Sequence, residues 1–249
     1  MTDPSYATPT SRPTLGRSFR LFRAHRVEQT DPDLFYGMLA ADSVGQLSQY
    51  ADLRGSRVLD VGGGPGYFAN AFRAAGASYT PLDSDLGELS GLGDPEKGTV
   101  IGSGMSLPFR DDAFDVTYSS NVLEHVPEPW TMADEMIRVT RPGGLVFLSY
   151  TLWWGPWGGH ETAPWHYLGG HRAADRYART HGKRPKNDFG SSLFAVTAGA
   201  GLRWASSQTG ADVLETMPRY HPRWAWWTLR VPVLREVTTW NLAIVLRKR

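Results

Sequence analysis

One segment constrains the fold of this chain more than any other: Val58–Tyr67, with the sequence Val-Leu-Asp-Val-Gly-Gly-Gly-Pro-Gly-Tyr. An apolar run typical of a buried strand leads directly into a glycine-rich turn, and a helical pattern follows it. Glycines let the backbone of such a turn approach a ligand closely, because no Cβ blocks the approach. The segment therefore predicts a ligand site at the carboxyl end of the first strand of an α/β sheet.

The spacing of the glycines and of the next acidic residue narrows the choice of ligand. Glycines fall at 62, 64 and 66, whereas a dinucleotide pyrophosphate site expects Gly-x-Gly-x-x-Gly, and position 67 is Tyr. Asp83 ends a second predicted strand, 21 residues after Gly62, which suits a carboxylate that binds both hydroxyls of a ribose. The alternative role for Asp83 is a helix N-cap. The pattern favours a nucleoside ligand over a nicotinamide dinucleotide, so an oxidoreductase is the weaker alternative.

Short apolar runs alternate with helical patterns along residues 57–150. This alternation predicts right-handed crossovers and a mainly parallel sheet. Residues 1–18 are rich in Thr, Ser and Pro, so we expect a disordered tail there, followed by one domain over 19–249 that begins with a helical cap over 19–50. The predicted strands are Arg57–Val61, Ser78–Leu82, Thr99–Gly102, Phe114–Ser119, Leu145–Tyr150, Leu202–Ser207 and Thr238–Leu246, and the predicted helices of the core are Phe68–Ala75 and Trp130–Thr140.

The composition excludes several classes of protein. The 249 residues include no cysteine, which removes disulfides, cysteine-ligated zinc and iron–sulfur clusters. A net charge of +1 gives no overall field that would attract nucleic acid. No apolar run approaches the roughly 20 residues that span a bilayer, and no secretion signal is visible at the start. We therefore expect a cytoplasmic protein.

Several motifs in residues 57–150, the predicted cofactor-binding core, resemble those of class I S-adenosylmethionine-dependent methyltransferases, type 11 branch. Val58–Gly66 is similar to the first motif, and Ser103–Phe109, Asn121–Val126 and Arg141–Gly144 are similar to the later ones, in order and at similar spacing. That branch includes the ubiquinone and menaquinone biosynthesis methylases, and uncharacterised actinobacterial members resemble this chain most. The resemblance implies a Rossmann-like, seven-stranded, mainly parallel sheet with an antiparallel last strand. It also implies S-adenosyl-L-methionine as cofactor, with S-adenosyl-L-homocysteine as product.

The resemblance implies roles for the residues near the methionine part of the cofactor. Asp60 and Gly62 would hold the methionine amino group. Gly64 and Gly66 would let the chain pass beneath the cofactor, and the backbone of Asn121 would lie near its methionine end.

A second set of residues is implied at the adenosine part. Asp83 would bind the ribose hydroxyls, with Ser84 near the adenine. Met105 would stack beside the adenine, whose edge the amides of Gly104 and Met105 would address, although Met105 could equally fill the core. Ser103 stands where the family often has an Asp that receives the adenine amino group, and a neutral acceptor should bind it more weakly.

The second half of the chain differs in composition from the first. Nine of the ten tryptophans and five of the seven histidines lie in residues 151–249. Residues 151–200 have weak periodicity and are predicted to form a lid or substrate insertion after the fifth strand. Residues 201–249 should hold the final strands and a Trp/Arg-rich segment, which suits a core, a subunit interface or a peripheral membrane contact. The oligomeric state is not predicted.

The tryptophans favour an apolar or ring-containing acceptor, so we expect methyl transfer to oxygen or carbon of a small molecule or lipid. Enzymes that methylate DNA amino groups carry an Asn/Asp-Pro-Pro-aromatic turn after the fourth strand, where this chain has Ser119–Val122. No nucleic-acid partner is therefore expected. A fold relative that binds the cofactor without catalysis is the alternative.

Histidines are the candidate catalytic bases, because their pKa lies near neutral pH. His125 follows the fourth predicted strand and serves either as base or as a packing residue. His160, Glu161 and His166 lie in the predicted lid, where surface positions are the alternative. A metal site built from His160, Glu161 and His166 or His171 matches no strong signature, so no metal is predicted.

Overall fold

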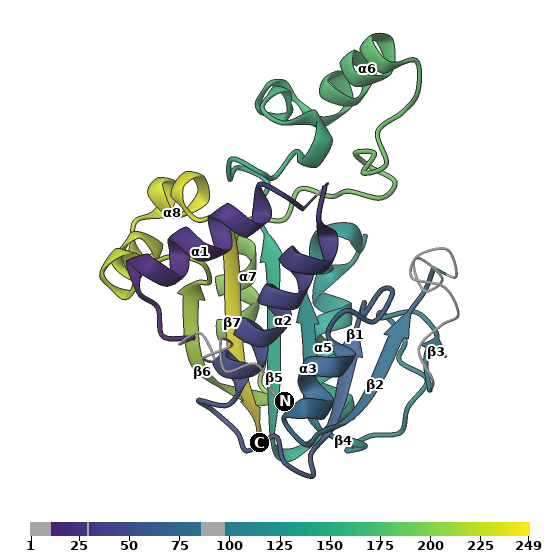
Figure 1. Ribbon diagram of the computed structural model, residues 1–249, viewed down its shortest axis with the longest axis vertical. Helices are drawn as coiled ribbons and strands as arrows, with labels where there is room; N and C mark the ends of the chain where they lie inside the picture. The colour runs from purple at the N-terminus through teal and green to yellow at the C-terminus, as the bar shows by residue number, and fades with distance from the viewer. Residues whose placement is uncertain (1–10, 29, 86–97) are drawn as a thin grey trace, which may run out of the picture.

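The computed structural model describes residues 11–28, 30–85 and 98–249. Its centre is a seven-stranded sheet in the order β3-β2-β1-β4-β5-β7-β6 (Figure 1). β7 pairs antiparallel with both neighbours, and the other pairs are parallel. This topology confirms the predicted fold class. The strands are β1 Arg57–Val61, β2 Ser78–Asp83, β3 Val100–Ile101, β4 Phe114–Ser120, β5 Thr140–Thr151, β6 Ala211–Pro218 and β7 Asn241–Lys248.

Helices cover both faces of the sheet. In Figure 1, α2 and α3 lie in front of it and α5 and α7 behind it, while α1 and α8 lie toward the carboxyl ends of the parallel strands. The α-helices are α1 Leu15–His25, α2 Pro32–Leu47, α3 Ala69–Ala74, α5 Pro129–Val139, α6 Gly170–His181, α7 Ala198–Ser207 and α8 Pro232–Thr238, and the 3₁₀ helices are η1 Leu123–His125, η2 His160–Thr162, η3 Trp165–Leu168 and η4 Arg223–Arg230.

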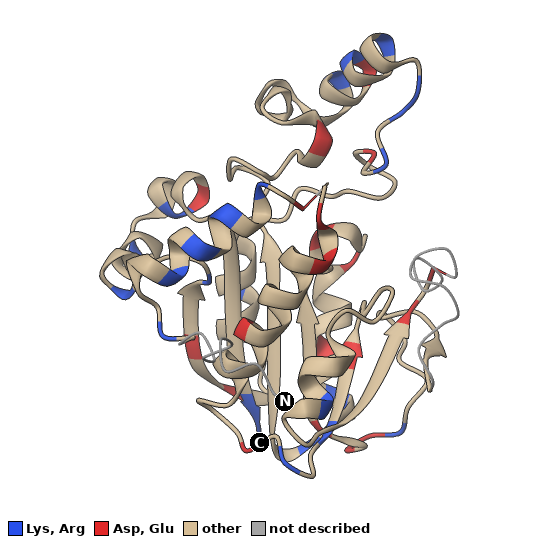
Figure 2. Ribbon diagram, viewed as in Figure 1, with Lys and Arg blue, Asp and Glu red and all other residues tan. Residues whose placement is uncertain are grey.

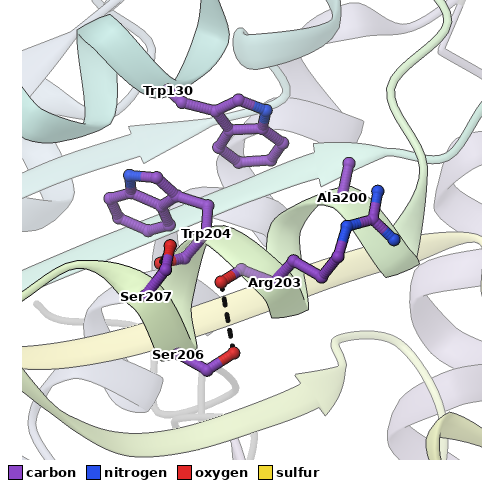
Figure 3. A pocket seen from close by; sticks show the side chains of 6 residues that line it. All are labelled: Trp130, Ala200, Arg203, Trp204, Ser206 and Ser207. Atoms are coloured by element: carbon purple, nitrogen blue, oxygen red, sulfur yellow. Dashed lines mark hydrogen bonds between the residues drawn. The ribbon is translucent and has the colours of Figure 1, made fainter.

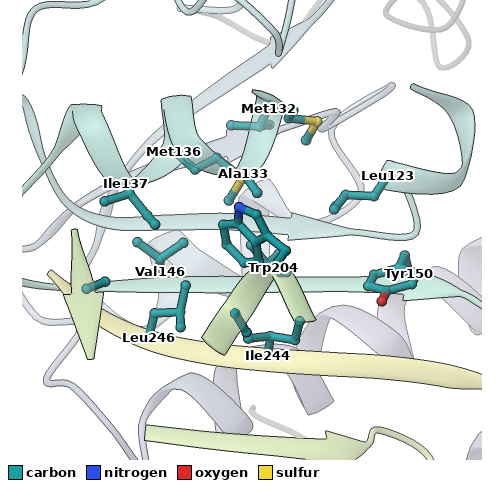
Figure 4. Close-up of a cluster of buried hydrophobic side chains, with 14 of the residues drawn as sticks. Leu123, Met132, Ala133, Met136, Ile137, Val146, Tyr150, Trp204, Ile244 and Leu246 are labelled. Atoms are coloured by element: carbon teal, nitrogen blue, oxygen red, sulfur yellow. The ribbon is translucent and has the colours of Figure 1, made fainter. Parts of the chain in front are cut away.

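The two faces of the sheet form separate hydrophobic cores. Side chains alternate between the faces along β5, as the pleat of a strand requires. Val146 and Leu148 face the core beneath α5 and α7, which Figure 4 shows with Met136 and Trp204. Phe147 faces the other core, with residues of α2 and α3. Because both faces are covered, the functional groups gather at the strand ends.

The N-terminal helix begins earlier than predicted. α1 starts at Leu15, after the N-cap Thr14, so residues 15–18 belong to a helix rather than to a disordered tail, and residues 1–10 lie outside the described residues. Arg17 is fully buried and donates to both carboxylate oxygens of Asp42, at 2.6 Å each. It also donates to the carbonyl of Arg219 at 2.8 Å. These partners lie far along the chain, so the local composition did not predict them.

Arg219 is the centre of a buried polar network at the end of β6. Its guanidinium donates to the hydroxyls of Ser43, Ser120 and Ser149 at 2.6–2.7 Å. The pKa of Arg219 is raised: burial lowers it, but the nearby Tyr220, Tyr118 and Asp42 outweigh burial. The network joins α2, β4, β5 and β6 just below the carboxyl ends of the strands.

The strand predicted at Leu202–Ser207 is wrong, because these residues form the second half of α7. Gly201, Trp204 and Ala205 are the buried residues of this part, and their spacing of three and four is helical. A Cβ at Gly201 would lie 2.0 Å from the hydroxyl oxygen of Tyr150, so the helix packs closely on β5. The sixth strand follows it, and the last strand begins three residues later than predicted.

The segment between β5 and α7 forms an insertion, residues 152–197, beyond the carboxyl ends of the parallel strands, with α6 farthest from the sheet (Figure 1). Its two ends meet, since the Trp153 amide donates to the carbonyl of Val196 at 2.9 Å. The Phe194 amide donates to the carbonyl of Glu124 at 2.8 Å, which fastens the insertion to the segment after β4. Within the described part of the chain, no helix combines the length and apolar character needed to cross a bilayer.

Candidate active site

The glycine turn follows β1 and contacts the segment after β4. Gly62, Gly64 and Gly66 have φ of +79°, +50° and +89°, a region that L side chains rarely adopt. A Cβ at Gly62 would lie 2.4 Å from Cγ2 of Val122, whereas a Cβ at Gly64 would meet nothing within 4 Å. Gly62 is therefore required by packing, while Gly64 leaves the face of the turn open to a ligand.

Asp83 lies against this turn, as the spacing predicted. One of its carboxylate oxygens accepts from the Gly64 amide at 3.0 Å, and the other accepts from the Asp85 amide at 3.1 Å. The bond from Asp85 is a local contact of the kind that the N-cap alternative anticipated. The bond from Gly64 holds the carboxylate of Asp83 against the glycine turn. Ser84 is exposed beside it. The partly buried carboxylate and open turn together fit a ribose.

Asp60 is buried beneath the turn. Its carboxyl accepts from the Tyr79 hydroxyl at 2.5 Å, and a Cβ at Gly63 would lie 3.3 Å from the same oxygen. Burial raises the pKa of Asp60 to about 7; the Tyr79 hydrogen bond opposes this rise and the charge of Asp83 adds to it. Asp60 therefore supports the turn from below, and its direct contact with a methionine amino group remains a prediction.

The predicted adenine segment lies beside the end of β1. A Cβ at Gly104 would approach Cγ1 of Val61 to 3.2 Å and Sδ of Met132 to 3.0 Å, so this backbone packs closely on the core. Met105 is partly buried against the same core, as the core-filler alternative anticipated. Its amide donates to the exposed Ser103 hydroxyl at 3.2 Å.

Asn121 closes the opposite side of the turn. It has a φ of +57°, and its amide donates to the carbonyl of Ser149 at 2.8 Å. Its side-chain oxygen accepts from Nδ2 of Asn241 at 2.7 Å. Because its side chain is engaged with β7, Asn121 faces the site mainly through its backbone.

His125 and His160 lie together above this edge, with ring centroids 5.0 Å apart. Nδ1 of His125 lies 2.7 Å from the carbonyl oxygen of Ser192, which fixes that nitrogen as the donor and leaves Nε2 to accept. His160 has its pKa lowered to about 3, first by burial and then by the nearby His125, so its ring is neutral.

Glu124 completes this cluster, and the sequence did not single it out. One donor atom from each of Glu124, His125 and His160 lies within 4.8 Å of the others. Glu124 is buried, and its Oε1 accepts from the Thr151 amide at 3.0 Å. Its Oε2 and Nε2 of His160 have no hydrogen-bond partner. In the sequence, only its position beside His125, a candidate base, could have pointed to Glu124 as a site residue.

The other predicted catalytic residues lie apart from this cluster. Glu161 is exposed and accepts from Nδ2 of Asn187 at 3.0 Å. His166 is buried against Trp153, with ring centroids 5.2 Å apart, and burial lowers its pKa. His171 is exposed. Among the described residues, the structure therefore does not assemble the metal set weighed from the sequence, and the group that it does assemble includes Glu124 and His125 instead.

An open hollow on the face of the sheet lies away from these motifs. Figure 3 shows it between α5 and α7, where the rings of Trp130 and Trp204 stack with centroids 5.6 Å apart. Its lining includes Arg203 and Ser206 but no residue of the glycine turn. The sequence did not predict this hollow, because its residues come from two helices distant in the chain.

The sheet order, the glycine turn and the acid at the end of β2 are those of a Rossmann-like methyltransferase. Residues 59–148 match the family described as a methyltransferase domain. An uncharacterized methyltransferase of Mycolicibacterium gilvum is 55% identical over 246 residues, covering 95% of this chain and 96% of its own length. One from Mycobacterium marinum is 54% identical over 248 residues, covering 96% of each chain.

The solved structures agree on the fold. An S-adenosylmethionine-dependent methyltransferase from Mesorhizobium loti superposes with a TM-score of 0.56 and 22% identity, covering 81% of this chain and 95% of its own. The chain belongs to the methyltransferase family that includes the mycobacterial proteins. Membership implies S-adenosylmethionine as the cofactor, and the open face at Gly64 beside Asp83 fits its ribose.

Proposed function

We propose that this methyltransferase transfers a methyl group from S-adenosylmethionine to oxygen or carbon of an apolar small molecule or lipid-like acceptor. The observation that carries the cofactor site is the bond from the Gly64 amide to Asp83 at the open glycine turn. The other predicted contacts belong to β1 or follow β1, β2, β3 or β4 along the chain. They are Asp60, Gly62, Gly66, Ser84, Ser103, Gly104, Met105 and Asn121.

The aromatic side chains of the insertion support an apolar acceptor. Trp154, Trp157 and Trp165 are 39–44% exposed, although aromatic rings of this size are usually more buried. They belong to the insertion, which lies beyond the carboxyl ends of the parallel strands, the end of the sheet where the glycine turn follows β1 (Figure 1). Exposed aromatic groups beside a polar site suit a ligand with an apolar body.

S-adenosylmethionine, when bound, supplies an already activated methyl group on a sulfonium. The residues of this chain then have to align the acceptor and exclude water, and alignment alone can contribute about 7–11 kcal/mol at its upper end. A hydroxyl acceptor also has to lose its proton. Nε2 of His125 is free to accept one, because Nδ1 is engaged with Ser192.

The test is transfer of labelled methyl from S-adenosylmethionine into a fractionated lipid and metabolite extract. We expect label in an organic-soluble fraction with the unmodified protein. Asp83→Ala should weaken cofactor affinity at least tenfold and lose the label, while the exposed control Asp212→Ala should retain both. Cofactor binding without any transfer would favour a non-catalytic relative, and calorimetric binding of NADH but not S-adenosylmethionine would favour an oxidoreductase.

A second proposal concerns the surface formed by α1, η4 and α8, which we call the Trp/Arg surface. Trp224 is 71% exposed, Phe19 60% and Val233 78%, which is unusual for large apolar side chains on a protein that stays in water. The same elements carry arginines: basic residues follow one another along α1 (Figure 2), and η4 begins and ends with arginine. Apolar groups ringed by arginine suit the interface of an anionic membrane.

Vesicle sedimentation tests this peripheral contact. The protein should sediment with vesicles that contain phosphatidylglycerol, and Trp224→Ser should reduce the bound fraction severalfold. Val213→Ser, which removes an apolar group exposed on β6 instead, is the matched control. Equal sedimentation of both variants with the unmodified protein would refute membrane contact through this surface, and self-association measured by ultracentrifugation would assign it to a subunit interface.

A further inference from the structure

We propose that Glu124, His125 and His160 bind a divalent transition-metal ion that fastens the insertion to the end of β4. The three donor atoms come from η1 and η2 and lie within 4.8 Å of one another. Two imidazole nitrogens and one carboxylate oxygen are the donor set of many sites for zinc and for ferrous iron.

Two polar atoms of the cluster are buried without a hydrogen-bond partner. Oε1 of Glu124 is satisfied by the Thr151 amide, which leaves Oε2 buried without a hydrogen bond. Nε2 of His160 is likewise buried without a partner. Buried polar atoms are rarely left unsatisfied in proteins, so two of them in one cluster indicate a missing group.

The orientation of His125 is that of a metal-bound histidine. Nδ1 donates to the carbonyl of Ser192, which leaves the lone pair of Nε2 available to an ion. Metal-ligating histidines commonly donate their second ring nitrogen to a carbonyl or carboxylate in this way, which fixes the ring and its tautomer. Ser192 belongs to the insertion, so this second contact also joins the insertion to η1.

His160 is held in place before any ion binds. It has a φ of +46°, which is uncommon for a residue other than glycine. The preceding glycines are packed so closely that a Cβ at Gly158 would lie 2.1 Å from the carbonyl oxygen of Trp153, and one at Gly159 would lie 2.5 Å from the His166 ring. An uncommon backbone conformation maintained by tight packing is typical of functional sites.

An ion bound by these three residues would join the insertion to the end of β4, and it would keep at least one coordination position free. The β4 end and the insertion would be joined by direct ligation in addition to the Phe194–Glu124 backbone bond. Three protein ligands usually leave a position for water or substrate, in contrast to the four of purely structural zinc sites. Because the ligands do not include the glycine turn, metal binding does not depend on cofactor binding. An ion held by Nε2 of His125 would, however, prevent that nitrogen from taking the proton of a hydroxyl acceptor.

Calorimetry with zinc on metal-stripped protein, without a polyhistidine tag, tests the site. We expect one zinc ion per chain, and cobalt in its place should give visible absorption bands that indicate nitrogen ligation. Glu124→Gln keeps the size of the side chain, and His160→Asn keeps a residue that tolerates positive φ. Each should weaken zinc binding at least tenfold, whereas the matched control His171→Asn, at an exposed histidine of the insertion, should leave it unchanged.

Two further measurements make the result decisive. Zinc should protect the insertion from limited proteolysis in the unmodified protein and in Asp83→Ala, but not in His160→Asn. If Glu124→Gln fails to fold, His160→Asn decides alone, because His160 is only partly buried. Zinc affinity in His160→Asn equal to that of the unmodified protein would overturn the proposal, as would cobalt spectra without nitrogen ligation. S-adenosylmethionine binding, measured in parallel, tests the other proposal separately.

Discussion

Replacing Gly62 by alanine should damage this protein far more than the same change at Gly64. Both residues have positive φ, so each alanine carries a backbone penalty of about 1–2 kcal/mol. Only at Gly62 does the new Cβ also overlap a side chain, at 2.4 and 2.6 Å from the two Cγ atoms of Val122. Overpacking of a filled site costs about 1–3 kcal/mol more.

The difference between the two variants isolates the overlap, because the loss of unfolded-chain entropy is the same for both. Urea unfolding should therefore place Gly62→Ala about 1–3 kcal/mol below Gly64→Ala. In a Val122→Ala background the gap should close, as a double-mutant cycle would measure. Equal free energies of unfolding for the two glycine variants, or a difference that persists in the Val122→Ala background, would refute the packing argument. Gly62 would then be required only for the approach of a ligand.

Two other changes test buried charge. Asp60 has its pKa raised to about 7, so the stability that its protonation contributes is complete below about pH 4 and is lost as the pH rises from there through 7. The free energy of unfolding of Asp60→Asn should therefore rise relative to that of the unmodified protein over this range, by at most about 1.4 kcal/mol per pH unit. Urea unfolding at several pH values measures this difference. A difference that does not change with pH would contradict the raised pKa of Asp60. Arg17→Ala leaves the Asp42 carboxylate buried without its partner and should cost about 3–5 kcal/mol. Arg17→Met combined with Asp42→Leu should recover much of this in thermal unfolding, and no recovery would show that the charge is not the cause.

The central sheet could be predicted because its strands carry their own signal. The predicted strands coincide with β1, β2, β4 and the apolar part of β5, and the spacing between Gly62 and Asp83 placed two strand ends side by side. The glycine turn of the candidate site was predictable for the same reason, because its signal lies in consecutive residues of the sequence.

The predictions that failed concern residues whose structure depends on partners distant in the sequence. Leu202–Ser207 mixes apolar and polar residues over a length too short to separate a strand from a helix. The structure forms a helix there, which packs closely on β5 where Gly201 meets Tyr150. Arg17 was placed in a tail because its partner Asp42 lies 25 residues away. Glu124 gave no signal of its own, since it gains its role only when the insertion brings His160 beside it.

The adjacent ends of the insertion make this segment exchangeable. Trp153 and Val196 are hydrogen-bonded to each other, so the chain leaves the core after β5 and returns to the same place before α7. A relative could replace the whole excursion by one of different length or composition without altering the order of the strands. Under the proposed function, such a replacement would change the acceptor that the enzyme prefers and leave the glycine turn and Asp83 unchanged.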